Sequence, residues 1–179
     1  NSSKFFQVLG KRQYQLDRYY VNDELGTYIV SDGVGSSQYS GMLAEILVSN
    51  LGLYLSSINA FNQMEIERVL DETVYFFNKK YENELPINVG CTLAFIKFLK
   101  NDEVILGHIG DTRIYILNGK DILYKSKDHN LAQEVDEDLR DSLPDNTLKQ
   151  LSRRLTRAIT PGAPVPGLDL RSIVVPQKQ

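Results

Sequence analysis

Residues 27–35 read TYIVSDGVG, in which strand-forming residues lead through Ser31 into Asp32 and Gly33. A strand that ends in a carboxylate and then turns on glycine holds that carboxylate rigidly, with bare backbone beside it. Hard divalent cations bind well to such a pairing of carboxylate and carbonyl oxygens. An isolated Asp-Gly pair is also a common turn. The rest of the chain must therefore distinguish a metal ligand from a plain turn.

The composition is that of a globular chain of one-domain size. The sequence has 179 residues, of which 42% are hydrophobic and 24% are charged. Its net charge of −3 argues against a nucleic-acid binder, which would usually carry a basic surplus. No apolar run approaches membrane-spanning length, so we expect no membrane partner. The single cysteine, Cys91, favours a reducing compartment, and we expect a cytoplasmic protein.

The residues before Thr27 predict a β-hairpin. Residues 17–21 have the pattern of a strand, and the residues that follow them supply a turn. With Val21 opposite Thr27, counting back along the pair brings Asp17 close to the end of the second strand and to Asp32. The hairpin therefore predicts two carboxylates at one end of a strand pair.

Two amphipathic helices are predicted after this hairpin. The second begins at Asn62 as N-cap, with Glu65 three residues later. Both predictions depend on apolar residues at helical spacing, which we interpret as core faces. These residues are Leu43, Ile46, Leu47, Leu51 and Tyr54 in the first helix and Ile66, Val69, Leu70, Thr73 and Phe77 in the second.

Strand patterns return after the helices and predict an antiparallel meander with short turns, at residues 91–98, 103–109, 113–117 and 122–125. The polar and acidic residues 128–148 predict a partly helical, mobile surface segment, and 151–159 a short amphipathic piece. A last strand is predicted at 170–175, with its hairpin partner expected beyond Gln179. Helices grouped between runs of antiparallel strands indicate an α+β domain.

Three aspartates stand at predicted strand ends, and this repetition favours a metal site over three unrelated turns. Asp17 and Asp32 flank the first hairpin, and Asp111 follows Gly110 in a tight turn. Clustered carboxylates repel each other unless a cation neutralises them. Ligands that are all oxygen suggest magnesium or manganese, not zinc. Arg12 could hold an anionic substrate group through its guanidinium.

The order of short motifs along the chain closely resembles that of the PP2C-type (PPM) metal-dependent protein serine/threonine phosphatases, in a bacterial-like version. Each motif is weak alone, whereas six in the correct order over nearly the whole chain are a strong signal. The motifs are Gly10-Lys11-Arg12 with Asp17-Arg18, Val30-Ser31-Asp32-Gly33-Val34-Gly35, Gly90-Cys91-Thr92-Leu93, Gly110-Asp111-Thr112-Arg113, Asp128-His129-Asn130 and Leu155-Thr156-Arg157-Ala158.

The resemblance implies a PP2C-like α-β-β-α sandwich of two antiparallel sheets flanked by helices, with the metals between the sheets. It implies that Asp32 bridges two metal ions and that the Gly33 carbonyl binds one of them. Asp17 would act on the metals, often through water, and Asp111 would bind a third, weaker ion. Arg12 would bind the substrate phosphate. Residues 128–151 resemble the variable flap beside the catalytic cleft.

The implied reaction is hydrolysis of phosphoserine and phosphothreonine in proteins. Two Mn²⁺ or Mg²⁺ ions would hold and deprotonate a bridging water, which attacks the phosphorus in line with the leaving oxygen. Positive charge from the metals and Arg12 would stabilise the phosphoryl oxygens. The expected partners are a phosphoprotein substrate and an opposing Ser/Thr kinase, with no nucleic acid and no membrane.

Some positions depart from the family pattern. Leu16 and Met42 stand where the family usually has polar or acidic residues. The family's later Asp-Gly and Asp-Asn motifs are absent, so we expect residues 1–179 to be a single catalytic domain that is incomplete at its C-terminus. The alternative is a pseudophosphatase or regulatory binding module with the same fold and an incomplete metal site.

Three further residues could take part in chemistry. Cys91 lies in an apolar strand, and we interpret it as a core residue because the implied mechanism needs no thiol. His108 lies on a predicted strand and is expected to be structural. His129 lies beside the predicted flap and is a candidate proton carrier close to the metal ligands.

Overall fold

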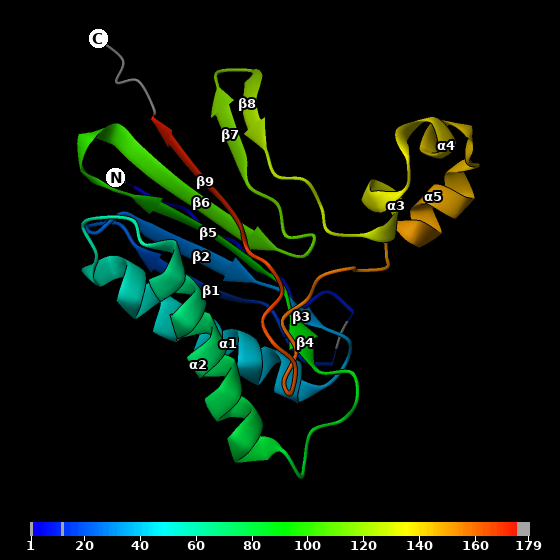
Figure 1. Cartoon of the computed structure of the whole chain (residues 1–179), viewed down its shortest axis with the longest axis horizontal. Helices are drawn as coiled ribbons and strands as arrows, with labels where there is room; N and C mark the ends of the chain where they lie inside the picture. Colours follow the sequence, from blue (N-terminus) through cyan, green and yellow to red (C-terminus); the bar gives the residue numbers. More distant parts are fainter. Residues whose placement is uncertain (1, 12, 175–179) are drawn as a thin grey trace.

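The computed structural model describes residues 2–11 and 13–174 (Figure 1). It begins with the expected hairpin, in which β1 (Arg18–Asn22) pairs with β2 (Thr27–Ser31). Asn22 lies opposite Thr27, one residue away from the predicted pairing. The shift has a local cause, because the Asn22 Oδ1 atom accepts a hydrogen bond from the Leu25 amide at 2.9 Å and so closes the turn.

The hairpin forms one side of a five-stranded antiparallel sheet in the order β1-β2-β5-β6-β9. Its other strands are β5 (Leu93–Phe98), β6 (Glu103–Ile109) and β9 (Asp169–Val174). The strand predicted near the end of the sequence therefore has a partner earlier in the chain, since β9 pairs with β6 over its whole length. Val175, the last residue of that predicted strand, lies outside the described residues, and a hairpin partner beyond Gln179 stays a prediction.

The predicted four-stranded meander is wrong. β7 (Tyr115–Asn118) and β8 (Asp121–Lys125) form a separate two-stranded sheet, and β9 occupies the edge next to β6. The chain leaves the large sheet at Gly110, whose φ of 99° turns it sharply after β6. Ile114 is then buried against the face of the sheet, which commits the following hairpin to a second layer.

Both predicted helices are confirmed. α1 (Gln38–Ser57) is capped by Ser37, and α2 (Gln63–Tyr81) is capped by Asn62, whose side chain accepts from the Glu65 amide at 3.3 Å. Leu43, Leu47 and Leu51 of the first predicted stripe are fully buried, as are Ile66 and Leu70 of the second. Figure 1 shows both helices on the same side of the large sheet.

The alternation of side chains along the strands divides the core between the two faces of the sheet. Phe95 and Ile105 point toward α1 and α2, whereas Ala94, Val104 and Leu106 point to the opposite face. There the cluster also contains Ile114, and Ile116, Tyr124 and Ile173 pack against it. Helices, the large sheet and the β7–β8 hairpin therefore form successive layers (Figure 1). This arrangement confirms the α+β fold of antiparallel sheets and flanking helices.

The expected flap consists of three short helices that project away from the sheets (Figure 1). They are α3 (Leu131–Glu134), α4 (Glu137–Ser142) and α5 (Asp145–Leu151), which confirms a partly helical segment. The predicted amphipathic piece at 151–159 is mostly irregular. Ile159 at its end is fully buried and bridges to Cys91. The remaining short elements are β3 (Gly33–Val34), β4 (Gly90–Cys91) and the 3-10 helix η1 (Lys100–Asp102).

Gly52 lets the Tyr20 ring pack directly on α1, and we predict that Gly52→Ala destabilises the protein by about 1–3 kcal/mol. An added Cβ would lie 2.4 Å from Tyr20 Cγ, so the ring must shift. That clash should outweigh the gain in helix propensity of about 1 kcal/mol. Urea unfolding measures the change. Leu53→Ala is the control, because Leu53 is exposed and its replacement should change stability by less than about 0.5 kcal/mol. A stabilised Gly52→Ala variant would contradict this prediction.

Candidate metal centre

Asp17 and Asp32 lie together at one end of the first hairpin. Arg18 pairs with Ser31, so the residues just beyond this pair, Asp17 and Asp32, come next to each other. Both line a cavity of about 430 Å³ and a neighbouring one of about 400 Å³. Both residues are exposed, so their carboxylates are accessible to a ligand. The structure thus brings together the two carboxylates for which the hairpin pattern predicted proximity.

The backbone at Asp32 is held by Thr92, a fully buried residue between β4 and β5. The Thr92 amide donates to the Asp32 carbonyl at 2.9 Å, and the Asp32 amide donates to Thr92 Oγ1 at 3.1 Å. The Ser31 hydroxyl adds a hydrogen bond of 2.6 Å to the Thr92 carbonyl. These contacts fix the point from which the Asp32 side chain projects.

Gly33 is required next to Asp32 because the chain passes close to Leu16. A Cβ at Gly33 would lie 2.7 Å from Leu16 Cβ and 2.8 Å from the Leu16 carbonyl oxygen. Leu16 is only 3% exposed, so its departure from the polar residue of the family pattern is explained by packing. Met42, the other departure, is partly buried against the main core. Leu16 lines the cavity of about 400 Å³ with an apolar side chain, whereas Met42 lines neither cavity.

Asp111 lies in the loop after β6, and Thr92 connects this loop to Asp32. A Cβ at Gly110 would lie 2.5 Å from Thr92 Cγ2, so the loop approaches Thr92 closely. The hydroxyls of Thr92 and Thr112 form a hydrogen bond of 2.5 Å. Thr112 lines the same cavity as Asp17 and Asp32, whereas Asp111 is half-buried and lines neither of the two cavities. From the sequence, Thr92 was recognised only as part of the motif Gly90-Cys91-Thr92-Leu93. The available signal was a hydroxyl residue between two apolar ones in a buried strand.

The three predicted aspartates do not form a tight ligand cluster. Among residues 2–11 and 13–174, the group of three side chains with potential ligand atoms within 4.8 Å of one another is His108, His129 and Asp169. Asp17 and Asp32 share a cavity, and Asp111 is positioned through Thr92 and Thr112. Arg12, the predicted phosphate ligand, lies outside the described residues.

The residues around Asp17 and Asp32 fit a hard divalent cation. The two carboxylates offer oxygen ligands, and no described histidine or cysteine lines either cavity. Gly33, the other predicted ligand, follows Asp32 directly but is buried and lines neither cavity. Basic side chains also lie on the cavity walls, with Lys4 and Arg18 in one and Lys11 in the other. Arg18 is already engaged in an ion pair with Glu45. The exposed lysines provide positive charge for an anionic group.

The surroundings of Cys91 and His108 indicate that both residues have structural roles. Cys91 is fully buried, and burial raises the pKa of its thiol to about 12, so it is not a nucleophile at neutral pH. His108 is 3% exposed, and the Lys127 carbonyl lies 2.8 Å from its Nε2 atom. Burial lowers the pKa of His108, which keeps the ring neutral. Both features agree with the core roles predicted for these residues.

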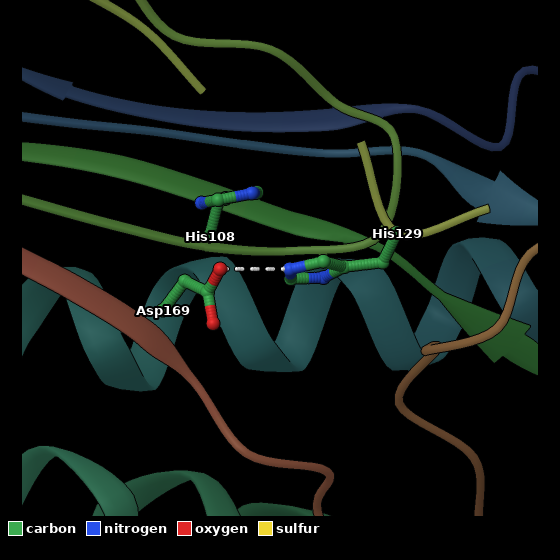
Figure 2. Close-up of side chains that lie close together, drawn as sticks. All are labelled: His108, His129 and Asp169. Carbon is green, nitrogen blue, oxygen red and sulfur yellow. Dashed lines mark hydrogen bonds and ion pairs between the residues drawn. The ribbon is translucent and has the colours of Figure 1, made fainter. Parts of the chain in front are cut away.

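His129 is buried at the base of the flap and contacts Gly110, the residue before Asp111. Its ring Nδ1 atom accepts a hydrogen bond from the Gly110 amide at 3.0 Å, and its own amide donates to the Gly110 carbonyl at 2.9 Å. Figure 2 shows its Nε2 atom directed at the Asp169 carboxylate, 3.0 Å away. The sequence indicated His129 as a candidate but did not predict its partner Asp169, which comes forty residues later along the chain.

The chain was compared with known proteins. The family profile described as "Protein phosphatase 2C" matches residues 13–157. Protein phosphatase PhpP of Streptococcus pneumoniae is 26% identical over 122 residues, which are 65% of this chain and 49% of PhpP. The chain therefore spans about half the length of this curated relative.

Solved structures share the fold. The Mycobacterium tuberculosis serine/threonine phosphatase PstP/Ppp superposes with a TM-score of 0.72 at 21% identity, over 90% of this chain and 68% of that one. The catalytic domain of PstP in complex with two manganese ions superposes with a TM-score of 0.69 at 20% identity, over 90% and 67% of the two chains. With the family profile matching most of the sequence, this chain belongs to the protein phosphatase 2C family.

Proposed function

We propose that this chain carries part of the catalytic site of a metal-dependent phosphatase that acts on phosphoserine and phosphothreonine in proteins. The observation that carries the proposal is the shared cavity of Asp17 and Asp32, with the Asp32 backbone held by Thr92. Its volume of about 430 Å³ is in the range of small-ligand sites and suits a phosphorylated side chain. The named relatives, PhpP and PstP, support the same class of enzyme.

The proposed metal ligands are Asp32 and the Gly33 carbonyl, with Asp17 close to the metals and Asp111 at a third, weaker position. All four offer oxygen atoms, which suits Mn²⁺ or Mg²⁺. The manganese complex of the PstP catalytic domain favours two ions as the basic set. Bound cations would supply an activated water and offset the charge on the phosphoryl group.

The chain's own basic residues would bind and orient the substrate phosphate. Lys4 and Lys11 line the two cavities that contain Asp17 and Asp32. Arg12 follows Lys11 directly in the sequence, and we propose it as the main phosphate ligand because a guanidinium can hold two phosphoryl oxygens at once. These groups would hold the phosphorus in the position required for in-line attack.

The proposed biological setting is an opposing Ser/Thr kinase in the cytoplasm. The buried, unpaired thiol of Cys91 is compatible with a reducing compartment. The net charge of −3 does not favour nucleic acid. In residues 2–11 and 13–174, no helix is both long and apolar enough to cross a membrane.

We predict that hydrolysis of a phosphothreonine peptide by the intact protein, extended to its natural terminus, requires added Mn²⁺ or Mg²⁺, because the proposed ligands are oxygen atoms of a hard-cation site. Phosphate release is measured after EDTA treatment and dialysis, and again after each cation is restored. Zinc at the same concentration is the control and should restore less activity. Activity that survives exhaustive chelation would contradict the proposed function.

A further inference from the structure

The His108, His129 and Asp169 cluster lies outside the cavity of Asp17 and Asp32, and its three side chains have the composition of a metal site. The tautomer of His129 argues against that role. Its Nδ1 atom accepts the Gly110 amide hydrogen, so the ring proton is on Nε2 and is donated to Asp169. A metal on Nε2 would move this proton to Nδ1, where it would face the Gly110 N–H.

We propose instead that His129 is a positioning residue that fixes the loop carrying Asp111. His129 binds both backbone groups of Gly110, through its own amide and through ring Nδ1. Gly110 has a φ of 99°, which glycine adopts without a side-chain clash, so its direction depends on the packing against Thr92 and on its backbone hydrogen bonds. The next residue is Asp111, so this inference rests on the proposed function, in which Asp111 is a metal ligand.

The ring of His129 is itself held from the other side. Asp169, the first residue of β9, accepts from His129 Nε2 at 3.0 Å and from Arg157 Nη1 at 2.9 Å. Burial of Asp169 favours its neutral form, but the hydrogen bonds from His129 and Arg157 outweigh burial and hold its pKa below the usual value. The ring of His108 stacks on His129, with 4.6 Å between ring centroids (Figure 2).

His129 also joins the loop of Asp111 to the base of the flap. The His129 carbonyl accepts from the Thr156 amide at 3.0 Å, and Asn130 bridges to Leu155. These contacts pair the segments that enter and leave helices α3 to α5. Because His129 also binds Gly110, hydrogen bonds through this one residue connect the flap base to the Asp111 loop.

Two substitutions distinguish the contribution of the Gly110 hydrogen bond at Nδ1 from that of the Asp169 hydrogen bond at Nε2. In His129→Asn the amide oxygen can replace Nδ1 as acceptor for Gly110, but the side chain is too short to reach Asp169. In His129→Gln the amide nitrogen can donate to Asp169 from near the position of Nε2, but no acceptor remains for the Gly110 amide. Asp169→Asn is the control, because its carbonyl oxygen can still accept from Nε2.

The test measures amide hydrogen exchange at Gly110 by NMR, together with calorimetric titration by Mn²⁺. We expect His129→Gln to speed Gly110 exchange at least about tenfold relative to the Ile105 amide in β6, and to weaken the weaker Mn²⁺ step by about 10–100-fold. His129→Asn and Asp169→Asn should stay within about threefold of wild type in both measurements. Ile105 reports global stability, because it lies in a strand paired on both sides.

Several results would overturn the proposal. Unchanged Gly110 exchange in His129→Gln would show that the His129 ring does not restrain the loop. Unchanged Mn²⁺ affinity in the same variant would show that His129 does not affect metal binding. An equal loss in His129→Asn would assign the role to the Asp169 contact. If wild type neither binds Mn²⁺ nor hydrolyses phosphopeptides, the proposed function fails, and Gly110 exchange in His129→Gln still decides whether His129 fixes the loop.

Discussion

Replacing Asp32 with alanine is expected to lower Mn²⁺ affinity by more than about 100-fold and to abolish phosphatase turnover. Residues that only orient a metal ligand are worth about 10–100-fold in affinity, and a direct ligand should be worth more. The fold should survive, because Asp32 contacts Thr92 through its own backbone amide and carbonyl, which alanine keeps. Calorimetric titration with Mn²⁺ and a phosphopeptide assay measure the two effects.

Two other variants make the Asp32 result specific. Asp121→Ala removes an exposed carboxylate at the start of β8 and should change neither quantity. Arg12→Ala should raise KM and leave Mn²⁺ affinity unchanged, since it removes a contact with the substrate phosphate only. Equal Mn²⁺ affinity in wild type and Asp32→Ala would refute the assignment of Asp32 as a metal ligand.

Removing Arg113 is expected to cost about 2–3 kcal/mol of unfolding free energy. Arg113 holds Asp128 through two hydrogen bonds, at 2.7 Å and 2.5 Å, and the Asp128 side chain is only 7% exposed. Loss of one partner of a buried pair costs about 3–5 kcal/mol, because the remaining charge is uncompensated. The Arg113 side chain is 46% exposed, so water can reach part of the vacated site and reduce the cost.

Urea unfolding of Arg113→Ala measures this loss, and Arg68→Ala provides a matched control. Arg68 forms ion pairs with Glu65 and Glu72 on the exposed surface of α2, where such contacts contribute about 0–1 kcal/mol. Asp128→Asn combined with Arg113→Ala should recover part of the loss, because it removes the uncompensated charge. Equal destabilisation by Arg113→Ala and Arg68→Ala would show that the Asp128 pair is no stronger than a surface pair.

Short-range signals predicted much of the fold. The hairpin before Asp32 was predicted from a turn between two strand patterns. The observed register differs from the predicted one by one residue, because the Asn22 side chain closes the turn. The cap at Asn62 and the apolar stripes predicted both helices. In each case the decisive contacts lie within a few residues of one another along the chain.

Strand partners could not be predicted in the same way. The pattern of residues 113–117 suits a strand in a meander equally well, and its separation from β6 depends on the burial of Ile114 against the far face of the sheet. β9 lies beside β6 although the flap and the loop before Asp169 separate them in sequence. Tertiary packing decides such pairings, and alternation within one strand does not encode it.

In the candidate site, too, contacts within one local element were predictable from the sequence, whereas contacts between distant segments were not. Proximity of Asp17 and Asp32 followed from the hairpin register, because both belong to one local element. The link from Thr92 to Thr112 and the contacts of His129 join residues from distant segments. Their hydrogen bonds are visible only when the strands are in place.

The location of bound manganese decides whether Asp32 and Gly33 are metal ligands. Crystals of the intact protein grown with Mn²⁺ would be measured near the manganese absorption edge, where the anomalous signal identifies the ion. We predict a peak within coordination distance, about 2.0–2.4 Å, of an Asp32 carboxylate oxygen and the Gly33 carbonyl oxygen. Manganese bound by His108, His129 and Asp169, with no peak beside Asp32, would contradict the assignment of Asp32 as a metal ligand.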